Sequence, residues 1–135
     1  MVAQQKVNAK MSKLKTFMKY LLGVFFVGAG VMHFVNPGFY LKLVPPYLPW
    51  HLGLVYLSGV AEILLGLLVV IPKYTWLAAW GLIALLIAVF PANIYTAMNP
   101  QIMPDVSPTA QLIRLPFQLV FIVWAWWFTR PELRR

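Results

Sequence analysis

The chain has 135 residues, of which 61% are hydrophobic and only 10% are charged, and its mean hydropathy is +0.77. A water-soluble domain carries about 25% charged residues, so this composition excludes an ordinary soluble domain and predicts a small integral membrane protein. The net charge of +8 is concentrated at the ends of apolar segments, which is typical of membrane orientation signals and argues against a nucleic-acid partner.

The first part of the chain predicts a tail, a span and a connector. Residues 1–15 are polar and basic, and we expect a mobile cytoplasmic tail. Residues 16–35 form an apolar run that is longer than that of a secretory signal peptide, so we predict an uncleaved first span. Residues 36–51 contain four prolines, which prevent a regular helix, and many aromatic and aliphatic side chains. We therefore expect a proline-rich segment at the membrane interface between helices 1 and 2.

The second span, residues 52–71, carries a single carboxylate, Glu62, near its middle. A helix of this length rises ~30 Å, the thickness of the hydrocarbon core of a bilayer. An ionised carboxylate at that depth costs at least ~2.5–3.5 kcal/mol, so Glu62 must face protein, water or a partner, or be protonated. Ser58 and Gly59 lie one turn before Glu62 and Gly66 lies one turn after it, and such a stripe of small residues lets a neighbouring helix approach closely.

The third span is predicted over residues 75–98. Pro91 cannot donate a hydrogen bond to the carbonyl of Ile87, so we expect a kink there. Asn93 follows closely. It either satisfies the main-chain groups that Pro91 leaves open or faces the interior of the bundle, and the sequence leaves both possibilities open.

The fourth span is predicted over residues 108–129, followed by a basic tail at 130–135. Ser107 is a suitable N-cap with Pro108 at the first helical position, and Pro116 lies inside the helix. Residues 16–129 thus form one all-α domain, a bundle of four transmembrane helices.

The basic residues predict the orientation of the bundle. The N-terminal lysines, Lys73 and Arg130 fall on one side of the membrane, whereas the opposite loops contain only Lys42 and Asp105. The positive-inside rule then places both termini in the cytoplasm, as expected for a protein of a bacterial inner membrane.

Polar residues from all four spans are predicted to converge in the outer half of the bundle. At ~1.5 Å per residue, Arg114 lies roughly 7–10 Å in depth from Glu62, within reach of a long side chain or one bridging water. The candidate ligand-binding or polar-core residues are Glu62, Arg114, Gln118, Asn93, His33 and Tyr95. A pocket between helices with a few convergent polar groups is the default hypothesis for a binding site.

Several of these residues have a structural interpretation as well. Glu62 and Arg114 form either a functional pair or one that only fixes the register of the helices. We expect His33 to meet water at the membrane surface, and we expect Gln111 to contact water at a helix end. No metal site is predicted, because the three carboxylates and two histidines share no spacing, and the lack of cysteine excludes an iron–sulfur cluster or a thiol centre built from this chain.

Five short motifs between His33 and Gln118, about two thirds of the chain, resemble the DoxX-like family of small four-helix membrane proteins. They are Gly30-x-x-His33-Phe34 followed by Pro37, Pro45-Pro46-x-x-Pro49, Ser58-Gly59-Val60-Ala61-Glu62-Ile63-Leu64-Leu65-Gly66, Phe90-Pro91-Ala92-Asn93-Ile94-Tyr95 and Arg114-Leu115-Pro116-x-Gln118. The resemblance implies a four-span bundle with the motif residues inside it. The family takes its name from a small subunit of a quinone-linked sulfur oxidoreductase, and some relatives are accessory or assembly factors. Relatives that rely on cysteines are not matched.

Three functions remain open at this level. The first is an accessory or membrane subunit of a quinone-linked redox system, with Glu62 on a proton route and with electrons supplied by a partner subunit or bound cofactor. The second is a non-catalytic protein that binds a lipid or small molecule or assembles a membrane complex. The third is a small proton-coupled transporter, which would require a homo-oligomer. The sequence does not decide whether the protein is an enzyme.

Overall fold

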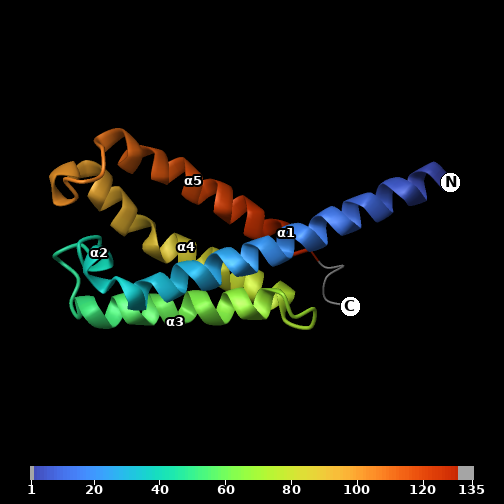
Figure 1. Ribbon diagram of the computed structural model, residues 1–135, viewed down its shortest axis with the longest axis horizontal. Coiled ribbons are helices and arrows are strands. Elements are labelled where there is room, and N and C mark those ends of the chain that lie inside the picture. Colours follow the sequence, from blue (N-terminus) through green and yellow to red (C-terminus); the bar gives the residue numbers. More distant parts are fainter. Residues whose placement is uncertain (1, 131–135) are drawn as a thin grey trace.

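The structure, a computed structural model, describes residues 2–130, and all regular elements in that part are helices. Four of them contain a stretch long and apolar enough to cross a membrane, namely Ser12–Val35, His51–Val69, Thr75–Met98 and Pro108–Trp127. The expected all-helical class with four apolar helices is confirmed. The elements in chain order are α1 (Val2–Val35), α2 (Pro37–Leu41), α3 (His51–Val69), α4 (Thr75–Met98), the 3-10 helix η1 (Pro100–Ile102) and α5 (Pro108–Trp127) (Figure 1).

The N-terminal segment differs from the expectation. Residues 2–15 are not a loose tail but the first half of α1, which is continuous from Val2. The segment has no proline or glycine before Gly23 and is rich in Ala, Gln, Lys, Met and Leu, which favour a helix. Of the expected basic C-terminal tail, residues 131–135 lie outside the described part of the chain.

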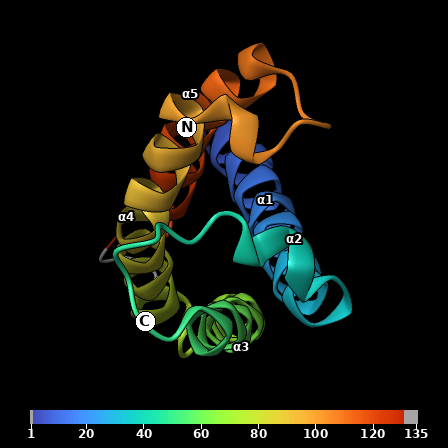
Figure 2. The ribbon, with the colours of Figure 1, turned by 90° about the vertical axis from the view of Figure 1, so that its left-hand side faces the viewer.

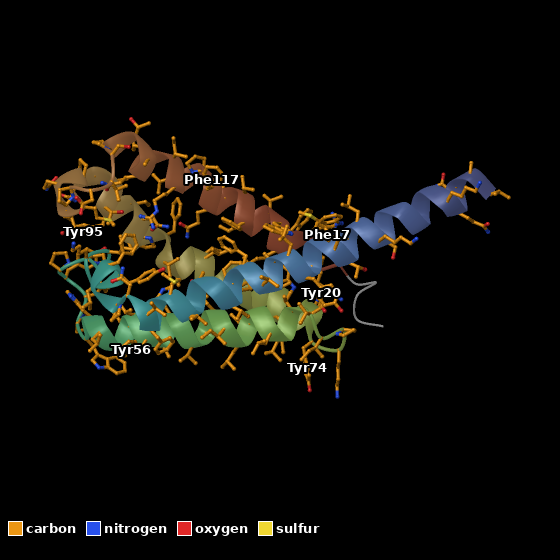
Figure 3. The ribbon with its side chains drawn as sticks, viewed as in Figure 1. Phe17, Tyr20, Tyr56, Tyr74, Tyr95 and Phe117 are labelled. Atoms are coloured by element: carbon orange, nitrogen blue, oxygen red, sulfur yellow. The ribbon has the colours of Figure 1, made fainter. Side chains whose placement is uncertain are left out.

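The bundle has two distinct ends (Figure 1). The end formed by residues 36–50 and 99–107 is called here the connector end. The other, formed by the turn at 70–74 and the C-terminal end of α5, is called the turn end, and the first half of α1 projects beyond it (Figure 1). Figure 3 shows Tyr20 and Tyr74 towards the turn end and Tyr56 and Tyr95 towards the connector end. Aromatic side chains near both ends of apolar helices are typical of membrane spans.

Basic side chains at the turn end lie over aromatic rings. The Arg130 guanidinium is 4.3 Å from the centre of the Trp126 ring, and Lys15 Nζ is 5.7 Å from that of Trp127. Such contacts let a cation stay at a membrane interface while its apolar stem remains in the hydrocarbon.

α1 and α3 pack closely through two pairs of glycines. A Cβ atom added at Gly30 would lie 2.6 Å from the carbonyl oxygen of Gly59, and one added at Gly23 would lie 2.7 Å from that of Gly66. The main chains of the two antiparallel helices therefore touch at both positions. The expected close approach at Gly59 and Gly66 is confirmed, and the neighbour is α1.

The apolar core occupies the half of the bundle nearer the turn end. Its buried residues are Leu22, Phe26, Val69, Ala78, Ala79, Leu82, Ile83, Leu86, Ala125 and Phe128. The outward surface is also apolar, with large exposed side chains such as Leu77 and Val123 on every long helix. A continuous apolar surface is unusual for a protein in water and is typical of contact with lipid.

α1 and α5 approach each other near the turn end and diverge towards the connector end. Figure 2, which views the bundle from the connector end, shows the helices in a horseshoe with α1 and α5 as separate arms. Phe121 of α5 contacts two rings of α1: it stacks on Phe25 with ring centres 4.6 Å apart and meets Phe26 edge to face at 6.2 Å. The half of the bundle beyond this contact is consequently not filled by helix packing.

Candidate functional site

A cavity of about 750 Å³ lies between the four long helices in the half of the bundle nearer the connector end. Most of its wall is apolar. The segment between α1 and α3 closes the connector end of the cavity with Leu43, Val44, Pro45 and Leu48. The proline-rich segment is therefore part of the cavity wall.

Polar side chains reach the cavity from every long helix and from α2. They are His33 on α1, Tyr40 on α2, Ser58 and Glu62 on α3, Asn93 on α4, and Arg114 and Gln118 on α5. Five of the six candidate residues are thus brought together. Tyr95 is the exception, because it does not line the cavity and lies near the loop at the connector end, where its main-chain carbonyl accepts a hydrogen bond from Asn99 (Figure 3).

The partner of Glu62 is His33. Glu62 Oε2 lies 3.3 Å from His33 Nδ1, and Nδ1 is 2.8 Å from the carbonyl oxygen of Ala29. A carbonyl oxygen only accepts, so this contact places a proton on Nδ1. Glu62 Oε2 is buried and makes no hydrogen bond within the described part of the chain. The cavity therefore contains a carboxylate oxygen whose hydrogen-bonding capacity is not used.

Two expectations from the sequence are corrected here. His33 does not meet water at the surface, since only 8% of the residue is exposed. Glu62 does not pair with Arg114 either, because the basic side chain within 4.0 Å of its carboxyl oxygens, among the described residues, is His33. Gly59 explains both outcomes: with no side chain there, α1 comes so close that the Cβ of His33 packs against Gly59, one turn from Glu62.

Tyr40 covers the His33–Glu62 pair. Its ring stacks on the imidazole of His33 with ring centres 3.8 Å apart and planes at 17°. Burial raises the pKa of the Tyr40 phenol, the nearby Glu62 carboxylate raises it further, and the Arg114 guanidinium acts in the opposite direction. Glu62 and Arg114 thus both act electrostatically on the same hydroxyl, although they do not touch each other.

Two amide side chains tie α4 to α5 beside Pro91. Asn93 Nδ2 donates to Gln118 Oε1, and Gln118 Nε2 donates to the main-chain carbonyl of Leu86. Leu86 directly precedes Ile87, whose carbonyl receives no hydrogen bond from Pro91 because proline has no N–H. Of the two possibilities for Asn93, the structure shows that it faces the interior of the bundle and binds Gln118. Gln118, and not Asn93, donates to a main-chain carbonyl near Pro91. Both prolines expected within spans, Pro91 and Pro116, lie inside continuous helices.

Gln111 has a structural role that the sequence analysis missed. It is 1% exposed, so the expected contact with water is wrong. Its Nε2 donates to the carbonyls of Pro100 and Val106, each at 3.2 Å, and so fastens the 99–107 loop to α5. Ser107 caps α5 as expected, because its Oγ accepts from the main-chain N–H of Ala110. The prolines around this loop could have indicated this role, because main-chain carbonyls near prolines often lack a regular helical donor and need one from a side chain such as that of Gln111.

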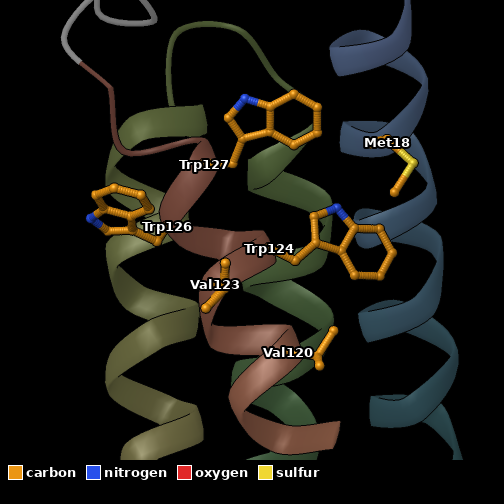
Figure 4. A pocket seen from close by; sticks show the side chains of 6 residues that line it. All are labelled: Met18, Val120, Val123, Trp124, Trp126 and Trp127. Carbon is orange, nitrogen blue, oxygen red and sulfur yellow. The ribbon is translucent and has the colours of Figure 1, made fainter.

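A second hollow of about 630 Å³ lies between α1 and α5 at the turn end (Figure 4). It is lined by Met18, Val120, Val123, Trp124, Trp126 and Trp127. None of these side chains titrates, so the hollow offers no acid–base chemistry. In the part of the chain that the structure describes, no three His, Asp or Glu side chains are grouped so as to hold a metal ion.

A family model described as a domain of unknown function, DUF8561, matches residues 22–129. The chain belongs to this family. The matched region includes all the residues that line the larger cavity and excludes the basic first half of the N-terminal helix. No curated protein and no solved structure matches the chain. The resemblance to the DoxX-like family stays a prediction.

Proposed function

We propose that the protein binds a quinone by its head group between the four helices and acts as an accessory membrane subunit of a quinone-linked redox system. The observation that carries this proposal is the cavity of about 750 Å³, with apolar walls and polar side chains from four helices. Sites for small hydrophobic ligands have volumes of about 300–1,000 Å³ and combine apolar walls with a few placed polar groups. The resemblance to the DoxX-like family supports the same class of ligand.

The polar groups suit a quinone head. The two carbonyl oxygens of a quinone only accept hydrogen bonds, and the Arg114 guanidinium offers five N–H donors at the cavity wall. Asn93 has a second amide N–H beyond the one that it gives to Gln118. A quinone takes up protons when it is reduced, and the adjacent His33 and Glu62 form a suitable proton route. A partner protein of the redox system would supply the electrons.

The proposal includes an orientation in a bacterial inner membrane. Lys19, Lys73 and Arg130 lie at the turn end, whereas Lys42 and Asp105 lie in the segments of the connector end. The positive-inside rule favours a cytoplasmic turn end, with both termini on that side. The cavity would then be in the outer half of the bundle.

One observation favours a second candidate, a non-catalytic protein that binds an anionic lipid or assembles a membrane complex. No carboxylate of the described chain lies within 4.0 Å of Arg114, although Arg114 lines the cavity. A phosphate or carboxylate head group would provide the charge partner that a guanidinium binds most strongly.

Native mass spectrometry of the protein released from its own membrane in mild detergent separates the two candidates. A bound quinone in stoichiometric amount supports the proposed function. A bound phospholipid or fatty acid supports the second candidate, and a partner polypeptide without a small molecule supports assembly.

Arg114→Gln tests whether the cavity is the site. We expect Arg114→Gln to weaken binding of a benzoquinone with a ten-carbon chain by about tenfold or more, because a charge-assisted hydrogen bond is lost. Lys73→Gln at the turn end is the matched control and should bind as the wild type does. Equal affinity in both variants, or a loss that appears only together with unfolding, would contradict the proposal.

A further inference from the structure

We infer that the ligand carries a long apolar chain and that this chain leaves the cavity sideways between α1 and α5 into the bilayer. This inference rests on the proposed function, because it takes the polar part of the cavity as the site of the head group. It adds the class of ligand, a polar head with an extended hydrocarbon chain, and the position of the chain.

The seam between α1 and α3, that is, the line along which the two helices meet, is closed to a ligand chain. Gly30 and Gly23 on α1 touch the main chain of α3 at Gly59 and Gly66, where even an added Cβ would lie within 2.7 Å of a carbonyl oxygen. A hydrocarbon chain about 4 Å thick cannot pass between main chains in such contact. The chain therefore has to leave elsewhere.

The seam between α4 and α5 is closed as well. Gln118 on α5 bonds to Asn93 and to the main chain of Leu86, both on α4. Gln118 is buried, so these bonds lie inside the bundle and link the two helices at the level of the cavity. A chain passing here would have to break buried hydrogen bonds.

Two seams remain where a large side chain both lines the cavity and is exposed. At the seam between α1 and α5 these side chains are Phe25, 46% exposed, and Phe117, 58% exposed. At the seam between α3 and α4, Leu57 is also 58% exposed. Their exposure to lipid and to the cavity marks both places as possible side openings.

The geometry favours the seam between α1 and α5. Both pairs of helices diverge towards the connector end (Figure 1), but the segment at 42–50 crosses the gap between α3 and α4 (Figure 2). α3 and α4 also approach closely where Gly81 faces Leu65. Residues Pro45 and Leu48 of the connector also line the cavity and help to close its connector end. The opening between α1 and α5 has an aromatic floor, formed by Phe25 stacked on Phe121, on which an apolar chain can lie.

Photolabelling tests the position of the chain. The probe is a benzoquinone whose ten-carbon chain ends in a diazirine, added to the full-length protein in phospholipid nanodiscs, with the unlabelled quinone as competitor. The inference predicts labelling around Phe25 and Phe117 that the competitor removes. Competable labelling around Leu57 or the connector would overturn the inference and leave the proposed function standing. Without competable labelling anywhere, both would be overturned.

A pair of matched variants gives a second test that does not depend on labelling chemistry. Phe117→Asn and Leu57→Asn change residues that are equally exposed and that both line the cavity. We expect Phe117→Asn to weaken binding of the ten-carbon quinone about tenfold more than binding of the same head with a methyl group, because Phe117 contacts the chain. Leu57→Asn should affect the two quinones to the same extent. A chain-length dependence in Leu57→Asn would overturn the inference, and so would equal losses of the two quinones in Phe117→Asn. A third variant, Leu119→Asn, lies on the outer surface of α5 and controls for the cost of an amide in lipid.

Discussion

The packing of α1 on α3 predicts that Gly30→Ala destabilises the protein although alanine is the better helix former. A Cβ at Gly30 would lie 2.6 Å from the Gly59 carbonyl oxygen and 2.7 Å from Ile63 Cγ1, whereas ordinary contacts begin at 3.4 Å. The carbonyl oxygen belongs to the main chain of α3 and cannot rotate away. The two helices would have to separate by several tenths of an ångström.

The magnitude follows from two opposing contributions. Extra volume in a packed interface costs about 1–3 kcal/mol. Replacing glycine by alanine within a helix gains roughly 0.5–1 kcal/mol of helix stability. Gly28 provides the matched control, because a Cβ there would have no atom within 4 Å. Gly28→Ala gains the same helix stability without the steric cost, so the two variants should differ by about 1–3 kcal/mol in free energy of unfolding.

The assay is equilibrium unfolding in mixed micelles, with helix content followed by circular dichroism while the fraction of denaturing detergent is increased. Gly30→Ala should unfold at a lower fraction of that detergent than Gly28→Ala, with the wild type between them or close to Gly28→Ala. If Gly28→Ala and Gly30→Ala unfold at the same point, the contact between the main chains of α1 and α3 is not what holds this pair together.

Two further variants test the buried polar groups. Gln111→Leu leaves the carbonyls of the 99–107 loop without a donor and should lower the free energy of unfolding by about 1–3 kcal/mol. Gln101→Leu, on the exposed side of the loop, is the control and should have little effect. Thermal denaturation measures both variants, and equal losses of stability would contradict the structural role of Gln111. His33→Leu leaves the buried Glu62 carboxyl without its polar neighbour and should lower the free energy of unfolding by about 1–3 kcal/mol, and adding Glu62→Leu should restore much of the loss. A double variant as unstable as the single one would show that the two side chains are not coupled.

The helices were predictable because their signals are local. Long apolar runs set the four spans, and Ser107 with Pro108 fixed the start of α5. The boundaries of α4 agree with the expected 75–98, and those of α3 and α5 agree within two residues. The helical state of residues 2–15 was missed because charge was taken as a sign of a loose tail, whereas helix propensity does not depend on apolar character.

The pairing of α1 with α3 had a signal in the sequence that was not used. Gly23 and Gly30 are seven residues apart, and so are Gly59 and Gly66. Matching intervals on two helices predict that the two glycine pairs face each other in an antiparallel arrangement. That register would also have placed His33 next to Gly59, and so within reach of Glu62.

Other features of the site could not be predicted from the sequence of each helix taken separately, because they depend on how the helices pack. Depth along the spans placed Arg114 near Glu62, but depth does not show which way a side chain turns around the helix axis. His33 is closer because its helix touches α3, whereas Arg114 is on α5 across the cavity. The prediction that Tyr95 belongs to the polar site is wrong for a related reason. Its depth along α4 is that of the site, but its side chain is on a side of α4 that does not line the cavity.

The distribution of glycine also explains why the bundle is open on one side. In lipid, apolar side chains gain little from leaving the hydrocarbon, so helices associate through close main-chain contact and polar groups. α1 and α3 have the glycine pairs, and α4 and α5 have the Asn93–Gln118 bond. α5 contains no glycine, and its stacking contact with α1 joins two large rings, Phe25 and Phe121, which hold the helix axes apart. The residues that would seal the bundle are thus absent from the same seam that leads to the polar cavity, and substituting the aromatic pair by small residues would be expected to close it.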